Sequence, residues 1–222
     1  MKLLGTLGVL CALAAPSTAS AEPSDGRLVA AGLAMAPPTY ALGVFTHEGS
    51  HAIAAHLVGA EVVGFHVLPG RDPRTGAFHF GRTDVRGLGP GAARKLFFAA
   101  PKITDLALLG GFAALLYAGG GANDGVLWPG NRYGQLALTV LATGWWVDFA
   151  KDVLAFSPHN DVTKLMSAFG FDSELARLPV RIVYAAVDVG LAALVWQGFR
   201  RTFAARDSDG ASLTLTLLST AF

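Results

Sequence analysis

Residues 42–60 read LGVFTHEGSHAIAAHLVGA, and the interpretation of the whole chain begins with this stretch. It contains the spacing His-Glu-x-x-His at His47, Glu48 and His51, with apolar residues on both sides. On an α-helix, residues four positions apart are separated by about one turn of rise and 40° of rotation, so both imidazoles can reach one metal ion. The pattern therefore predicts a helix that carries a metal site.

The chain around this helix is unusually apolar. Of its 222 residues, 52% are hydrophobic and 15% are charged, whereas a soluble domain carries about a quarter of charged residues. The apolar residues gather in a first block at 28–46 that resumes at 52–63, and in further blocks at 96–123, 133–147 and 182–199. Blocks of this kind are typical of membrane helices. We therefore expect a mainly α-helical integral membrane protein with about four transmembrane helices, located as a multi-pass protein in a bacterial inner membrane.

The first apolar block is interrupted by Pro37 and Pro38. Proline is tolerated in the first turn of a helix and disrupts a helix interior. The interruption predicts an apolar lead-in, followed by a helix that begins near Pro38 or Thr39 and ends near Gly59. Beyond it, residues 61–89 hold two β-prone stretches around a Pro/Gly-rich turn, which predicts a small β-hairpin after the first helix.

The two ends of the chain differ from its middle. Residues 1–21 read as a signal peptide, with a positive start, an apolar stretch and a small-x-small cleavage site; an uncleaved anchor is the alternative. We expect a membrane-embedded domain over 22–207 and a flexible tail over 208–222. The single cysteine, Cys11, lies in the leader, so a metal site in the mature chain would use His, Asp or Glu.

The residue types of the motif favour zinc chemistry. Neutral imidazole from His47 and His51 and a carboxylate are among the usual ligands of Zn²⁺, which keeps one position open for water in catalytic sites. Glu48 lies beside the ligands, where it could take a proton from a metal-bound water and pass it to a leaving amine. The alternative is a polar helix face without a metal, but ionisable groups in an apolar block are costly unless they have a function.

A third ligand must come from elsewhere in the chain, and Asp161 is the best candidate. It follows a break at Ser157 and Pro158, where Ser157 resembles a helix N-cap with Pro158 in the first turn. Irregular backbone at membrane depth is tolerated where it is buried in protein or lines a cavity. His56 lies about 140° around the helix from His51, which makes it a poor ligand. The candidates that remain open are His159, Asp148 and Asp188.

At this point the sequence resembles the site-2 protease family of intramembrane zinc metalloproteases. The residues that carry the resemblance are the 47–51 motif, then Ala54, Ala55, Gly59 and Val62, then FHVLPG over 65–70. Their order is similar to the family's first core helix followed by a membrane-associated hairpin. The resemblance covers about residues 38–70 firmly and the rest of the chain loosely.

The resemblance also implies a zinc ligand, because in the family a distant Asp in a Pro-containing helix break completes the site. Asp161, three residues after Pro158, matches that position. The sequence departs from the family where its usual Asp-Gly pair is Asp161-Val162, and where its Gly-Pro-x-x-Asn motif is reduced to APKIT over 100–104.

Together these features predict a zinc metalloendopeptidase with His47, His51 and Asp161 as metal ligands and Glu48 as the catalytic base. By resemblance, it would hydrolyse peptide bonds in or near membrane-spanning segments, so its partners would be a membrane protein or peptide substrate and the lipid bilayer. A net charge of +1 offers no argument for nucleic acid. Two alternatives stay open: a non-catalytic metal-binding module, and a metal transporter with a path along Asp105, Asp148 and Asp188. The presence of Glu48 favours the peptidase.

Overall fold

The structure is a computed structural model that describes residues 22–71, 76, 78–118, 128–154 and 160–204. Within these ranges the chain is mainly helical with a small β-hairpin, which confirms those two parts of the predicted fold class. The helices are α2 (Asp25–Leu57), α3 (Ala92–Tyr117), α4 (Arg132–Leu154), α5 (Asp161–Ala168) and α6 (Glu174–Phe203). The signal peptide expected at 1–21 and the tail expected at 208–222 lie outside the described residues.

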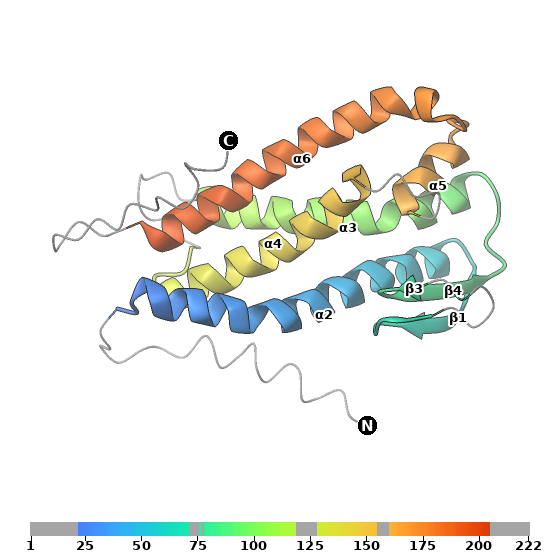
Figure 1. Ribbon diagram of the computed structural model, residues 1–222. Coiled ribbons are helices and arrows are strands. Elements are labelled where there is room, and N and C mark those ends of the chain that lie inside the picture. The colour runs from blue at the N-terminus through green and yellow to red at the C-terminus, as the bar shows by residue number, and fades with distance from the viewer. Residues whose placement is uncertain (1–21, 72–75, 77, 119–127, 155–159, 205–222) are drawn as a thin grey trace.

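The helices form a bundle around α4. In Figure 1, α4 crosses between α2 and α6, and it packs against α2, α3 and α6. The short helix α5 lies beside α3, close to the beginning of α6. A core cluster joins three of the long helices through Leu109, Phe112, Leu116, Ala142 and Val195. Close approach within this bundle depends on small residues; a Cβ atom added at Gly198 of α6 would lie 2.7 Å from the Phe112 ring.

Three of the described helices are long and apolar enough to cross a membrane: α2, α3 and α6. The sequence led to an expectation of about four, and the described residues contain three that meet this measure. Helix α4 is not among them; polar residues such as Gln135, Thr139 and Asp148 are distributed along it. The apolar helices present large hydrophobic side chains outward, and Leu33 and Leu57 of α2 are each 71% exposed. Such surfaces are stable when lipid covers them.

The first long helix differs from the prediction. It does not begin near Pro38 but runs unbroken from Asp25, with Pro37 and Pro38 in its interior. Proline is tolerated inside membrane helices where neighbouring helices support the backbone. Here α2 packs closely on α4 just after the two prolines, and a Cβ atom added at Gly144 would lie 2.8 Å from Cγ2 of Thr39. Packing between helices thus overrides the local preference of proline.

The predicted β-hairpin is confirmed. Strand β1 (Glu61–His66) pairs antiparallel with β4 (Arg82–Arg86), and the shorter β2 (Gly70–Arg71) pairs with β3 (Phe78–His79) nearer the turn. Strands β1 and β4 both contact α2, and Figure 1 shows them beside its C-terminal half. This arrangement places the hairpin next to the helical segment that carries the histidine motif.

Candidate metal centre

Helix α2 brings the residues of the motif together in the interior of the protein. His47 and His51 are one turn apart on the helix, and their ring centroids are 5.1 Å apart. His47 is 9% exposed, His51 is 5% exposed and the intervening Glu48 is 7% exposed. Imidazole and carboxylate groups are seldom buried to this extent unless they are paired or bind a metal.

Helix α5 supplies the third side chain. Its N-cap is Asn160, whose side chain accepts a hydrogen bond of 2.7 Å from the backbone N–H of Thr163. The predicted cap at Ser157 and the following Pro158 lie outside the described residues. Because Asn160 caps the helix, Asp161 occupies the first turn of α5. Its Oδ2 atom lies close to both motif histidines.

The distances in this cluster are short. Oδ2 of Asp161 is 3.1 Å from Nε2 of His47 and 3.0 Å from Nε2 of His51. The candidate ligand atoms of the three residues all lie within 4.8 Å of one another. For ligands about 2.0–2.1 Å from a tetrahedral zinc ion, neighbouring ligand atoms are separated by about 3.3 Å. The distances of 3.1 Å and 3.0 Å are within about 0.3 Å of that value, so small adjustments would suffice to place the ligands around an ion.

The other nitrogen of each ring determines which atom faces the cluster. Nδ1 of His51 donates a hydrogen bond of 2.8 Å to the backbone oxygen of Phe97, which can only accept. Nδ1 of His47 lies 2.8 Å from a carboxylate oxygen of Asp148, which also acts as an acceptor. In a neutral imidazole the proton is then on Nδ1 and the lone pair is on Nε2. Both histidines therefore present Nε2 lone pairs to Asp161.

Three acceptor atoms meeting at one point repel one another unless a cation lies among them. An ionised Asp161 carboxylate would be the anionic member of this group. The buried group of His47, His51 and Asp161 could hold a metal ion.

Glu48, the residue next to His47 on α2, is held by the hairpin. The hydroxyl of Thr83 in β4 lies 2.8 Å from Oε2 of Glu48 and 3.0 Å from its backbone oxygen, and can donate to either. Gly81, just before β4, approaches the same side chain so closely that an added Cβ would lie 2.8 Å from Cγ and 2.9 Å from Oε1 of Glu48. The hairpin therefore fixes the direction of the Glu48 carboxylate.

The remaining residues considered from the sequence are placed differently. His56 is exposed and is not part of the cluster, in keeping with its unfavourable position on the helix. His159 lies outside the described residues. Asp148 contacts Nδ1 of His47, on the opposite side of the ring from Asp161, so it supports a candidate ligand and is not one of the three converging side chains. Asp188 lies on α6 and is not a member of the group.

Sequence reasoning missed the residues that orient the motif. Thr83 and Gly81 belong to a hairpin whose position against α2 has no signature in the sequence. Lys102 was also missed; its ammonium group is buried and contacts Asp148. A lysine and several aspartates within otherwise apolar helices are unusual, and this signal could have directed attention to α3 and α4.

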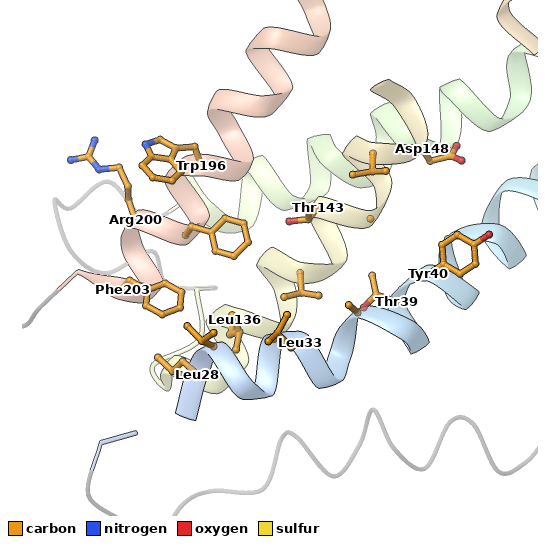
Figure 2. A pocket seen from close by; sticks show the side chains of 18 of the residues that line it. Leu28, Leu33, Thr39, Tyr40, Leu136, Thr143, Asp148, Trp196, Arg200 and Phe203 are labelled. Atoms are coloured by element: carbon orange, nitrogen blue, oxygen red, sulfur yellow. The ribbon is translucent and has the colours of Figure 1, made fainter. Parts of the chain in front are cut away.

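An apolar groove leads to the edge of the site. It has a volume of about 1080 Å³ and runs between α2 and α4, with α6 closing one end. Figure 2 shows Trp196, Arg200 and Phe203 of α6 at that end, and Tyr40 and Asp148 at the other. The last residues of α2 that line the groove are Gly43 and Val44, about one turn before His47. The groove thus connects the apolar flank of the bundle with the neighbourhood of the cluster.

Comparison with protein-family models, with curated proteins and with solved structures found no match to this chain.

Proposed function

We propose that this protein is a membrane zinc metallopeptidase that hydrolyses peptide bonds in or near membrane-spanning segments. The observation that carries the proposal is that His47, His51 and Asp161 converge, while Glu48, the residue next to His47 on α2, is also buried. A site that only stores a metal needs ligands, whereas a hydrolytic site also needs a base next to them.

The donor set suits zinc. Two neutral imidazoles and one carboxylate form a three-ligand set of the kind found in catalytic zinc sites, which keep a further position for water or substrate. His47, His51 and Asp161 would hold the ion. When bound, zinc would supply Lewis acidity, which polarises a carbonyl group and makes water nucleophilic near neutral pH.

Glu48 would carry the proton in this reaction. Its Oε2 atom is close to the Thr83 hydroxyl, and its Oε1 atom lies near Gly81. The Glu48 carboxylate would accept the proton released as water attacks the scissile carbonyl, and would return it to the amine nitrogen as the peptide bond breaks. Thr83 would contribute by keeping the carboxylate in one orientation through the cycle.

The groove is a suitable approach for an apolar substrate. It is lined by apolar side chains of α2, α4 and α6 and ends near Asp148, whose carboxylate contacts His47. A membrane-spanning segment of a substrate could lie against this surface and extend its unwound end towards Glu48. The exposed apolar faces of α2 and α6 are consistent with a bilayer around the groove.

The transporter alternative receives less support. Its path would use Asp105 and Asp148, but the ammonium group of Lys102 lies 3.3 Å from Oδ2 of Asp105 and 3.0 Å from Oδ2 of Asp148. A tethered cation therefore already occupies the space among these acids. The non-catalytic binding module differs from the peptidase only in turnover, and the test below separates the two.

The test compares the full-length protein with its Glu48→Gln variant, both reconstituted in liposomes with single-span membrane proteins as substrates. Zinc content is measured by mass spectrometry, and new protein termini are identified by N-terminal labelling. We expect about one zinc per chain in both proteins. Cleavage should fall by about 10²- to 10⁴-fold in the variant, because an amide cannot act as a general base.

Two results would contradict the proposal. Equal cleavage by both proteins would mean that Glu48 is not the base. Bound zinc without any new termini, across soluble peptides and single-span substrates alike, would support a binding module in place of a peptidase.

A further inference from the structure

Asp148 connects the candidate metal centre with a second cluster of buried charges. It lies on α4, 101 residues from His47, and its Oδ2 atom is 2.8 Å from Nδ1 of His47. The same oxygen is 3.0 Å from Nζ of Lys102 on α3. The Asp148 side chain is 13% exposed, so these contacts are made largely out of solvent.

Lys102 is held on several sides. Its Nζ atom is 2.5 Å from the backbone oxygen of Asp148, 3.1 Å from Oδ2 of Asp152 and 3.3 Å from Oδ2 of Asp105. Its side chain is 7% exposed. A buried ammonium group with this many partners has little freedom to move. Lys102 therefore fixes the Asp148 carboxylate against the ring of His47.

We propose that Asp148, anchored by Lys102, is a positioning residue that holds the proton of His47 on Nδ1 and directs its Nε2 lone pair towards Asp161. This inference rests on the metal site of the proposed function and concerns its zinc affinity. Histidine ligands commonly donate their second ring N–H to a carboxylate or carbonyl, which fixes the tautomer and increases the basicity of the ligating nitrogen.

The two histidines are supported by different kinds of group. His51 donates to the backbone oxygen of Phe97, a partner that no side-chain substitution removes. His47 depends on the side chain of Asp148. A carboxylate also adds negative charge near the ion, which a carbonyl does not. Affinity for the metal should therefore respond to substitution at position 148.

The experiment uses Asp148→Asn in the full-length protein. An asparagine can turn its NH₂ group towards Nδ1 and favour a proton on Nε2, the nitrogen that must bind the metal. We expect zinc affinity, measured by competition with a chelating dye, to fall about 10- to 100-fold. Asp148→Glu should recover part of this loss, because it restores a carboxylate. In cobalt-loaded protein, Asp148→Asn should also shift the visible absorption bands.

A second measurement begins with the wild-type protein, so its first result does not depend on the folding of a variant. In zinc-loaded wild-type protein with ¹⁵N-labelled histidine, His47 should show a strongly hydrogen-bonded Nδ1–H signal. Asp148→Asn should move this signal and leave that of His51 in place, which separates a local effect from general destabilisation. Asp188→Asn, which removes an acid on α6 that is not part of the cluster, should change neither the signals nor the affinity.

Unchanged zinc affinity and cobalt spectrum in Asp148→Asn would overturn the inference, as would the absence of a hydrogen-bonded Nδ1–H signal for His47 in the wild-type protein. The outcome is independent of proteolysis. If the protein binds zinc through this arrangement but cleaves no substrate, the proposed peptidase is disproved and the role of Asp148 stands. If the protein is an active protease whose zinc affinity does not change in Asp148→Asn, the role of Asp148 is disproved and the peptidase stands.

Discussion

Nε2 of His51 and Oδ2 of Asp161 lie 3.0 Å apart, although 110 residues separate them in the chain. His51 comes from the C-terminal half of α2 and Asp161 from the first turn of α5. Both α2 and α5 pack against α3, so α3 is the common support that brings the two side chains together.

Asp161→Ala should weaken zinc binding by more than about 100-fold. Loss of a residue that only hydrogen-bonds to a metal ligand typically weakens metal binding by about 10- to 100-fold, so the loss of a ligand itself should cost more. The reason is that alanine removes the only anionic member of the group of His47, His51 and Asp161. Chelator competition measures the affinity. Asp188→Ala is the control; if both variants bound zinc as tightly as wild type, Asp161 would not be a ligand.

Removal of zinc should lower the thermal stability of the protein in detergent. A ligand present at 100 times its Kd stabilises the folded state by about 2.7 kcal/mol, so the midpoint of unfolding should rise when zinc is restored. His47→Ala lacks one of the converging nitrogen atoms and should show no zinc-dependent change. A similar rise in this variant would place the stabilising zinc at another site.

Gly81→Ala should reduce proteolysis while zinc remains bound. The added Cβ would lie 2.6 Å from Cγ1 of Val44 and 2.9 Å from Oε1 of Glu48, so the hairpin or the carboxylate must move. A displacement of about 1 Å at a reacting group can reduce the rate about 100-fold. Rate and zinc content are measured on the same preparation.

Gly49→Ala is the matched control for this prediction, because it places a methyl group directly beside Glu48 in open space, with nothing within 4 Å. Its activity should stay close to that of the wild type. An active Gly81→Ala variant would show that the hairpin does not orient the base.

Gly198→Ala should destabilise the bundle by about 1–3 kcal/mol, the usual effect of overfilling a packed interior. The new Cβ would lie 2.7 Å from the ring of Phe112 and 2.8 Å from Oγ1 of Thr139. On the same helix, Gly190 has nothing within 4 Å, so Gly190→Ala should be neutral or slightly stabilising. Thermal unfolding in detergent compares the two; equal midpoints would argue against the close contact of α6 with α3 and α4.

The sequence alone was sufficient for the features that depend on local geometry. The turn of an α-helix places His47 and His51 on one face whatever the rest of the chain does, and the Pro/Gly turn between two β-prone stretches led to a hairpin that the structure contains. The apolar blocks also identified most of the long helices. The start of α2 was wrong because a local rule for Pro37 and Pro38 was applied where packing on α4 decides the outcome.

Only the tertiary structure decided which distant groups meet the motif. The sequence favoured Asp161 but left His159, Asp148 and Asp188 open, since nothing in the order of residues states which helix faces which. The bundle places Asp161 against Nε2 of both histidines and Asp148 against Nδ1 of His47. Whether an acid can act as a ligand or only supports one depends on which ring nitrogen it reaches, and that choice is made by the packing of α4 and α5 around α2 and α3.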